Sequence, residues 1–372
     1  MNKNSRAPSI LVYAIVREAF FFMVCIMNRK ENIIKEKTTV VKYYELTPDE
    51  ERTMKDFLEF EDLKRKLNTS KVRVVIPEEE EEFAKQFFLQ NNYYDFSIYK
   101  KCLPQRDDNC FSFKECVELY EFNSFLRENL MKFTGKIELL IKSSIIHSLC
   151  SNYNGKLQVG ECYLDSSLYR NQDYFIGLIE RIGMSLYNSQ RKSLPVAHHV
   201  EEKKCKFPFW VVVPELTFGE TTKLIEQLDS KYYELWIEEL FLSNSYYSSV
   251  PALRDHIIST SKSWISATWF IRNVCAHYGR LYGCNFNIGV PSFYSPTLRE
   301  IKKVNKLKTH NKDLFAYMLA IKQIIICHGE NVHQEWNDFI EEIERRFDKS
   351  SILEVSKIGF PKEGDWKKIL QI

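Results

Sequence analysis

A long helical repeat of apolar residues between Phe113 and Cys150 most constrains how this chain can fold. Apolar side chains recur there at intervals of three and four, the spacing that places them on one face of an α-helix. The pattern favours one or two core helices and an all-α architecture. The apolar positions are Leu119, Phe122, Leu126, Leu130, Phe133, Ile137, Leu140, Ile141, Ile145 and Leu149.

Weaker patterns extend this architecture to the rest of the chain. Further helices are predicted at residues 169–187, 219–242, 251–282, 298–326 and 331–347. Short strands are predicted at 40–46 and 71–76, and the run 209–213 is either a short strand or a buried turn. We therefore expect a mainly all-α protein, a helical bundle with a few short strands. Its expected parts are an N-terminal segment (1–45), a main helical domain (46–296) and a helical C-terminal extension packed on it (297–372).

The N-terminal segment is first apolar and then basic. The run from Ile10 to Met27 is close to the lower length limit for crossing a bilayer, but Arg17 and Glu18 lie at its centre, where charge is costly. It lacks the small-residue cleavage site of a secretory signal. We expect the functional protein to begin at Met23 or Met27, or the segment to be partly disordered. A membrane-associated tail is the alternative.

Charge and cysteine content limit the possible partners. The formal net charge is only +2, so a nucleic-acid site would have to be a local patch. Ten cysteines are scattered without a C-x-x-C pair, which favours reduced thiols in the cytoplasm over disulfides or a zinc site. His198 and His199 are adjacent and point in different directions, so they are a poor metal site. We expect no metal, no cofactor and no obligate membrane partner.

The most informative short motif is Arg272 followed, after four intervening residues, by His277. An arginine offers a planar fork of donors that suits phosphate oxygens, and a histidine can give or take a proton near neutral pH. The two together could cleave RNA without a metal. Taken alone, the motif is a weak signal that often arises by chance, and a surface arginine with a hydrogen-bonded core histidine is the more ordinary interpretation.

A regular helix would not direct these two side chains at one point. Five positions correspond to about 140° around the axis and roughly 7.5 Å along it. The side chains converge if the arginine reaches around, if the helix is irregular, or if a second copy of the helix faces the first across a two-fold axis. The small residues Val274, Cys275 and Ala276 would permit such an approach, and Asn273 could orient an imidazole or a phosphate.

The string from Ile271 to Tyr282 resembles the signature of the Abi-like abortive-infection family of bacterial phage defence, of the AbiD/AbiF type, within the HEPN superfamily of helical ribonucleases. Other segments resemble the family in the same order along the chain. They are Asn91-Asn92-Tyr93-Tyr94, Leu119 to Asn123 with Leu126-Arg127, Ile137-Glu138, Phe209-Trp210 with Glu215 to Gly219, and Gly359-Phe360-Pro361 with Trp366. Three places depart from the pattern. Asn123 stands where the family usually carries aspartate, Tyr278 where a second histidine is common, and Gly283-Cys284 where the family has a more polar pair.

The resemblance implies a HEPN-like helical bundle and a metal-independent endoribonuclease that cleaves single-stranded RNA by attack of its 2′-hydroxyl. It implies catalytic roles for Arg272, His277 and Asn273, and we assign substrate binding to Arg280, Tyr278 and Arg127. A homodimer with a composite site and a protein or RNA antitoxin are the expected partners. The alternative is a non-catalytic module of a defence or toxin–antitoxin system that binds RNA or protein.

Overall fold

The structure is a computed structural model that describes residues 57–248, 253–304, 311–361 and 366–372. The strand predicted at 40–46 and the apolar N-terminal run lie outside these residues. The described part is helical apart from one small sheet, so the prediction of a mainly all-α protein is confirmed. It forms two compact units, one of residues 141–239 and one of residues 57–140 and 240–372.

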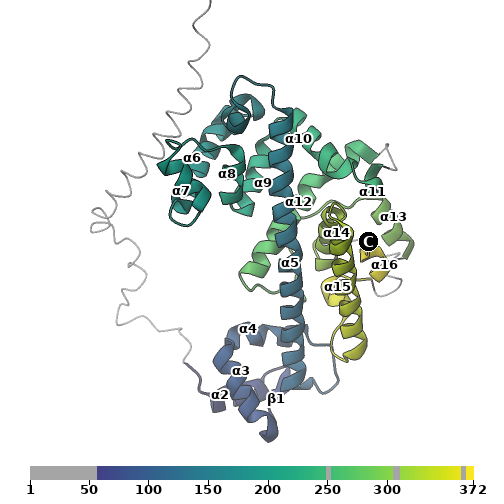
Figure 1. Ribbon diagram of the computed structural model, residues 1–372. Helices are drawn as coiled ribbons and strands as arrows, with labels where there is room; N and C mark the ends of the chain where they lie inside the picture. The colour runs from purple at the N-terminus through teal and green to yellow at the C-terminus, as the bar shows by residue number, and fades with distance from the viewer. Residues whose placement is uncertain (1–56, 249–252, 305–310, 362–365) are drawn as a thin grey trace, which may run out of the picture. The chain divides into compact units, whose positions relative to one another are not determined.

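Helix α5 (Phe113–Asn152) is a single unbroken helix and contributes to both units (Figure 1). The predicted apolar face is buried, with the exception of Leu140, which is half-buried. On the opposite face, Leu139 is exposed. The three-and-four spacing therefore identified the core side of this helix correctly.

A small parallel sheet precedes α5 in the chain. Strand β1 (Arg73–Val75) lies within the predicted strand 71–76 and pairs with β2 (Cys110–Ser112), so that Val74 is opposite Phe111. The sequence did not indicate β2, because its three residues lie in a polar loop. Around the sheet are α2 (Phe60–Thr69), the short turn Glu78–Glu80, α3 (Glu81–Gln90), α4 (Tyr93–Ser97) and the turn Ile98–Cys102.

The unit of residues 141–239 is built from short helices that follow the end of α5. Its elements are the turns Val159–Leu164 and Ser166–Leu168, then α6 (Gln172–Ser189), α7 (Leu194–Glu201), α8 (Phe209–Glu215), α9 (Phe218–Gln227) and α10 (Ser230–Ile237). The helix predicted at 219–242 is interrupted because Asp229 accepts a hydrogen bond from the Lys231 amide and begins α10 as its N-cap.

The expectation of a strand or buried turn at 209–213 is wrong, because these residues form helix α8. A short apolar run is buried in either conformation, so its composition does not distinguish helix from strand. Val211, Val212 and Val213 are all buried, and α8 packs against α6 and the turn Val159–Leu164. Pro214 lacks the amide hydrogen that would continue the helical hydrogen bonding, and α8 ends one residue later, at Glu215.

The other unit places its core between helices from the C-terminal half. These are α11 (Ser245–Ser248), α12 (Arg254–Ala276), α13 (Ser295–Val304), α14 (Leu314–Ile325), α15 (Glu330–Lys349) and α16 (Trp366–Leu370), with a turn at Val355–Ile358 and a π-helical turn at Glu238–Leu242 before α11. Every residue of α14 is buried, and α12 packs along it. The segment 298–326 thus contains parts of two helices, and the second begins at its N-cap Asp313.

None of the described helices has the length and apolar character needed to cross a membrane.

The tail of the chain is fixed by specific contacts with the core helices. The Trp336 indole donates to the carbonyl of Leu370 at 2.8 Å, and the Lys322 ammonium donates to the carbonyl of Ile369 at 2.8 Å.

Candidate functional site

Helix α12 carries Arg272 in its last turns but ends at Ala276, so His277 is the residue that caps it. The prediction of one helix through Tyr282 is therefore wrong at its C-terminal end. The amide of His277 still donates to the carbonyl of Asn273 at 3.0 Å, so the helix becomes irregular only at His277 itself. This ending does not join the two side chains by a hydrogen bond or an ion pair in the described residues.

The end of α12 is a Schellman cap with an unusual residue in it. The amide of Tyr278 donates to the carbonyl of Cys275 at 3.1 Å, and the amide of Gly279 donates to the carbonyl of Val274 at 2.7 Å. Tyr278 occupies the left-handed position of this motif, with φ of 55°, where glycine is usual. Gly279 is required for a different reason, since a Cβ there would lie 2.8 Å from the Cγ1 of Val274.

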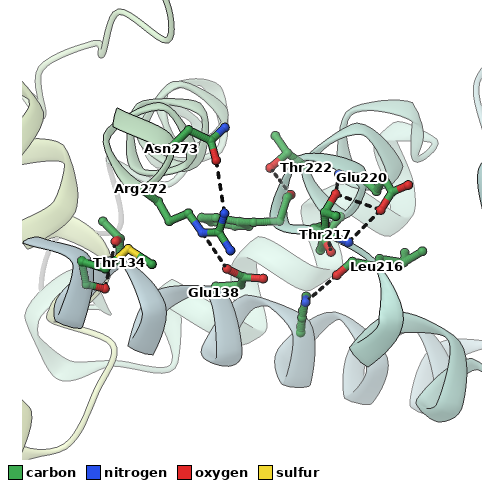
Figure 2. Close-up of polar contacts among 12 residues, drawn as sticks. Thr134, Glu138, Leu216, Thr217, Glu220, Thr222, Arg272 and Asn273 are labelled. Atoms are coloured by element: carbon green, nitrogen blue, oxygen red, sulfur yellow. Dashed lines mark hydrogen bonds and ion pairs between the residues drawn. The ribbon is translucent and has the colours of Figure 1, made fainter. Parts of the chain in front are cut away.

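The guanidinium of Arg272 lies between a carboxylate and an amide (Figure 2). Its Nε is 3.4 Å from Oε2 of Glu138 on α5, and its Nη1 donates to Oδ1 of Asn273 at 3.3 Å. The Arg272 side chain is 30% exposed and that of Glu138 is 14% exposed. The ion pair thus restricts one edge of a guanidinium that still reaches the surface.

The imidazole of His277 is exposed to solvent. Within the part of the chain that the structure describes, it forms no hydrogen bond, and no ion pair or hydrogen bond joins it to Arg272. Asn273 contacts the arginine instead of the histidine. The structure therefore brings Arg272 and Asn273 together and leaves His277 available at the surface beside the cap.

Arg127 on α5 contacts the residue that follows His277. Its Nη1 donates to the Tyr278 carbonyl at 3.0 Å, its Nη2 donates to Oγ of Ser124 at 2.7 Å, and its guanidinium carbon is 5.7 Å from the centre of the Tyr278 ring. Arg127 thus helps to hold the backbone beside the candidate histidine, a contact that its sequence position alone does not predict.

Asn123 on α5 fixes the chain after the cap. Its Oδ1 accepts hydrogen bonds from the amides of Leu281 at 2.8 Å and Tyr282 at 3.0 Å, and the residue is fully buried. An aspartate at this position could accept the same two bonds through one oxygen. The change from the family's usual residue therefore preserves the acceptor that holds this loop.

Arg280 is directed at a sulfur atom. Its Nη1 donates to Sγ of Cys102 at 2.9 Å. Burial raises the pKa of the Cys284 thiol, and the nearby Arg280 opposes this rise. These contacts connect Arg280 to the loop that begins at Gly283. Arg280 is half-buried, so part of its side chain remains accessible.

The small residues near the end of α12 differ in their surroundings. Cys275 is buried, and burial raises the pKa of its thiol to about 12. Its thiol is therefore neutral at physiological pH and is a poor nucleophile. Val274 and Ala276 are half-buried, so they are the members of the trio with surface available to a second chain.

The described residues contain no cluster of three or more histidine, cysteine, aspartate or glutamate side chains that could hold a metal ion. Nδ1 of His199 lies 2.7 Å from the carbonyl of Lys206, a contact within its own loop.

Glu138 is the member of the site to which the sequence assigned no role. It is separated from Arg272 by more than a hundred residues, so spacing along the chain could not pair the two. The feature of the sequence that could have identified Glu138 is its position between Ile137 and Ile141, which are buried in α5. A carboxylate in such surroundings requires a partner, because burial of an unpaired charge is costly.

Comparison with known proteins gives one family. The family model described as "Abi-like protein" matches residues 86–283, which is more than half of the chain and includes Asn123, Glu138, Arg272 and His277. A search of curated proteins and a search of solved structures gave no match. With the match covering this helix cap and the α5 residues that contact it, the chain belongs to the Abi-like protein family.

Proposed function

We propose that this protein acts in abortive infection as a metal-independent endoribonuclease, with Arg272 and His277 at its active site. Membership of the Abi-like family supports the role in phage defence. The pattern of free cysteines among the described residues is consistent with action in the cytoplasm. A protein or RNA antitoxin would restrain the activity in the host cell.

The proposed reaction uses a nucleophile that the RNA supplies. The 2′-hydroxyl attacks the adjacent phosphorus, the bond from phosphorus to the 5′-oxygen breaks, and the products are a cyclic phosphate and a 5′-hydroxyl. His277 removes the proton of the attacking hydroxyl or protonates the leaving oxygen. Arg272 stabilises the charge that develops on the phosphoryl oxygens. Asn273 contacts Nη1 of Arg272 and orients it.

One observation carries this proposal. Arg272 and His277 lie in the same unit at the end of the same helix, and both reach the surface, since the histidine is exposed and the arginine is partly exposed. A histidine retained only for packing would be buried and hydrogen-bonded. The exposed imidazole beside a half-buried guanidinium is instead the arrangement that a phosphodiester could approach.

The site would be shared by two copies of the chain. Arg272 forms an ion pair with Glu138 and a hydrogen bond with Asn273, and no hydrogen bond or ion pair joins it to the histidine of its own chain in the described residues. Two cap regions facing each other across a two-fold axis would place both types of side chain around one phosphate. Mixing Arg272→Ala and His277→Ala proteins should then restore part of the activity that each lacks.

The deciding experiment is cleavage of single-stranded RNA in the presence of EDTA. The wild-type protein should cut, Arg272→Ala and His277→Ala should not, and a 2′-deoxy substitution at the cut position should block cleavage. Matched controls are Arg65→Ala and His147→Ala, which remove an exposed arginine and an exposed histidine elsewhere. Full activity of Arg272→Ala and His277→Ala would contradict the site assignment.

The same assay distinguishes the non-catalytic alternative. The ion pair between Arg272 and Glu138 favours it, because a guanidinium with a carboxylate partner can serve packing alone. In that case the wild-type protein would bind RNA or a partner protein without producing a cyclic phosphate. Detection of that product by mass spectrometry would exclude the alternative.

A further inference from the structure

Tyr278 is an aromatic residue that the fold holds out toward solvent. Its side chain is 81% exposed, although most large apolar and aromatic side chains of its unit are buried. Its backbone is in the left-handed region, with φ of 55°, which side chains with a Cβ rarely adopt. A glycine would fit this position of the cap without strain. A tyrosine therefore occupies a position whose backbone conformation favours glycine, a residue without a side chain.

One face of the Tyr278 ring already has a cationic neighbour. The guanidinium carbon of Arg127 is 5.7 Å from the ring centre, and the same guanidinium donates to the Tyr278 carbonyl at 3.0 Å. Tyr120 lies on α5, as Arg127 does, and its ring centre is 6.0 Å from the same guanidinium carbon. Arg127 thus limits the positions of the Tyr278 ring, while the high exposure leaves the rest of the ring surface open.

We propose that Tyr278 is a stacking platform for an unpaired base of single-stranded RNA, next to the phosphate that His277 approaches. The inference rests on the proposed function, which supplies RNA as the ligand. Exposed aromatic rings bind single-stranded nucleic acid because every base has a flat face that stacks on them. Tyr278 directly follows His277, so a base on this ring and a phosphate at the imidazole belong to the same or neighbouring nucleotides.

This contact determines the class of substrate. Bases in a double helix stack on their neighbours and are not available to a protein ring, whereas bases in loops and single strands are. Tyr278 therefore favours unpaired RNA and tolerates different base identities, because stacking involves no readout of hydrogen-bonding edges. The Arg127 guanidinium behind the ring adds positive charge close to the RNA backbone.

The experiment measures binding with a probe that cannot be cleaved. The probe is a short single-stranded RNA in which each adenine is replaced by 2-aminopurine and each 2′-hydroxyl is methylated. Stacking on a tyrosine quenches 2-aminopurine fluorescence. Wild-type protein and Tyr278→Phe should quench the probe, whereas Tyr278→Ala and Tyr278→Gly should bind it about tenfold or more weakly and without quenching. Tyr174→Ala is the control, because it removes another exposed tyrosine in a different helix.

Each result bears on a separate proposal. If wild type cleaves unmodified RNA but neither quenches the probe nor differs from Tyr278→Ala in affinity, the stacking platform is refuted and the nuclease stands. If wild type quenches the probe and Tyr278→Ala does not, but neither cleaves RNA, the platform stands and the nuclease is refuted. Thermal unfolding of each variant shows whether a weaker affinity reflects loss of the folded state.

Discussion

The Oε2 atom of Glu138 lies 3.4 Å from the Nε atom of Arg272, although the two residues are far apart in the chain. The carboxylate is the more buried partner, with 14% of its side chain exposed. The pair restricts one edge of the guanidinium, and Asn273 accepts a hydrogen bond from another part of it. A substitution of Arg272 therefore affects the stability of the unit as well as any chemistry.

Arg272→Ala should reduce the free energy of unfolding by about 1 kcal/mol, because it removes the ion pair with the largely buried Glu138 carboxylate; partial exposure of the arginine limits the loss. The double variant Arg272→Ala with Glu138→Gln should recover part of that stability, since it also removes the charge that Arg272 balances. It should not recover cleavage, which we expect to fall about a hundredfold or more in both variants. Urea denaturation and single-turnover cleavage rates measure the two effects. Recovery of cleavage in the double variant would contradict the role given to Arg272.

Asn123→Ala should destabilise the protein by about 2–4 kcal/mol, because two backbone amides, those of Leu281 and Tyr282, lose their acceptor at a fully buried position. Asn123→Asp should be less harmful, since it retains an oxygen for both amides. Thermal and urea unfolding compare the three proteins. Equal stability of the alanine variant and wild type would show that the loop after the cap does not depend on this side chain.

Tyr278→Gly should be more stable than Tyr278→Ala by about 1 kcal/mol, because the left-handed conformation is costly for a residue with a Cβ. Both variants lose the same ring and the same contact with Arg127. The difference in their free energies of unfolding therefore measures the cost of the left-handed backbone conformation. Urea denaturation is the measurement. If the alanine variant is as stable as the glycine variant, Tyr278 does not adopt the left-handed conformation.

Lys322→Met should stabilise the protein near neutral pH by up to about 3 kcal/mol. Burial lowers the pKa of this ammonium from 10.5 to about 8, which corresponds to roughly 3.5 kcal/mol at about 1.4 kcal/mol per pKa unit, and the lost hydrogen bond to the Ile369 carbonyl reduces the gain. The sign follows from linkage. Below about pH 8 the Lys322 ammonium is charged in both the folded and the unfolded state, so the cost of burying the charge is fully present. Between about pH 8 and the ordinary pKa of 10.5, the folded state is deprotonated and the unfolded state is not, so the free energy of unfolding rises with pH.

The gain from Lys322→Met should consequently shrink as the pH rises above about 8, while an exposed control, Lys349→Met, shows no such trend. The loss of the hydrogen bond to the Ile369 carbonyl sets a limit on the gain. Urea denaturation across this pH range is the measurement. A gain that stays constant with pH would mean that the ammonium is not desolvated in the folded state.

The sequence predicted the helical elements best where apolar residues were numerous and regularly spaced. The face of α5 that includes Phe122, Phe133 and Ile145 is buried as expected, because a long amphipathic repeat has only one favourable orientation. The strand at 71–76 was located, but its partner at Cys110–Ser112 was not, since three residues in a polar loop have no detectable periodicity.

The end of α12 illustrates a second limit of sequence prediction. A glycine commonly marks the left-handed position after a helix, and Gly279 is the nearest glycine, yet the left-handed residue is Tyr278. Arg272 and His277 were recognised from their chemistry and from the family resemblance. The contacts of Arg272 with Glu138 and of Arg127 with Tyr278 arise from tertiary packing, which local patterns do not encode.

The helix cap has an entropic consequence for His277. Its own amide donates to the Asn273 carbonyl at 3.0 Å, and the two following amides donate to Cys275 and Val274, so the backbone on both sides is already ordered. Only the torsions of the imidazole remain to be fixed when a substrate arrives. In the proposed reaction little chain freedom would then be lost on binding, and the imidazole would begin each encounter close to its working position.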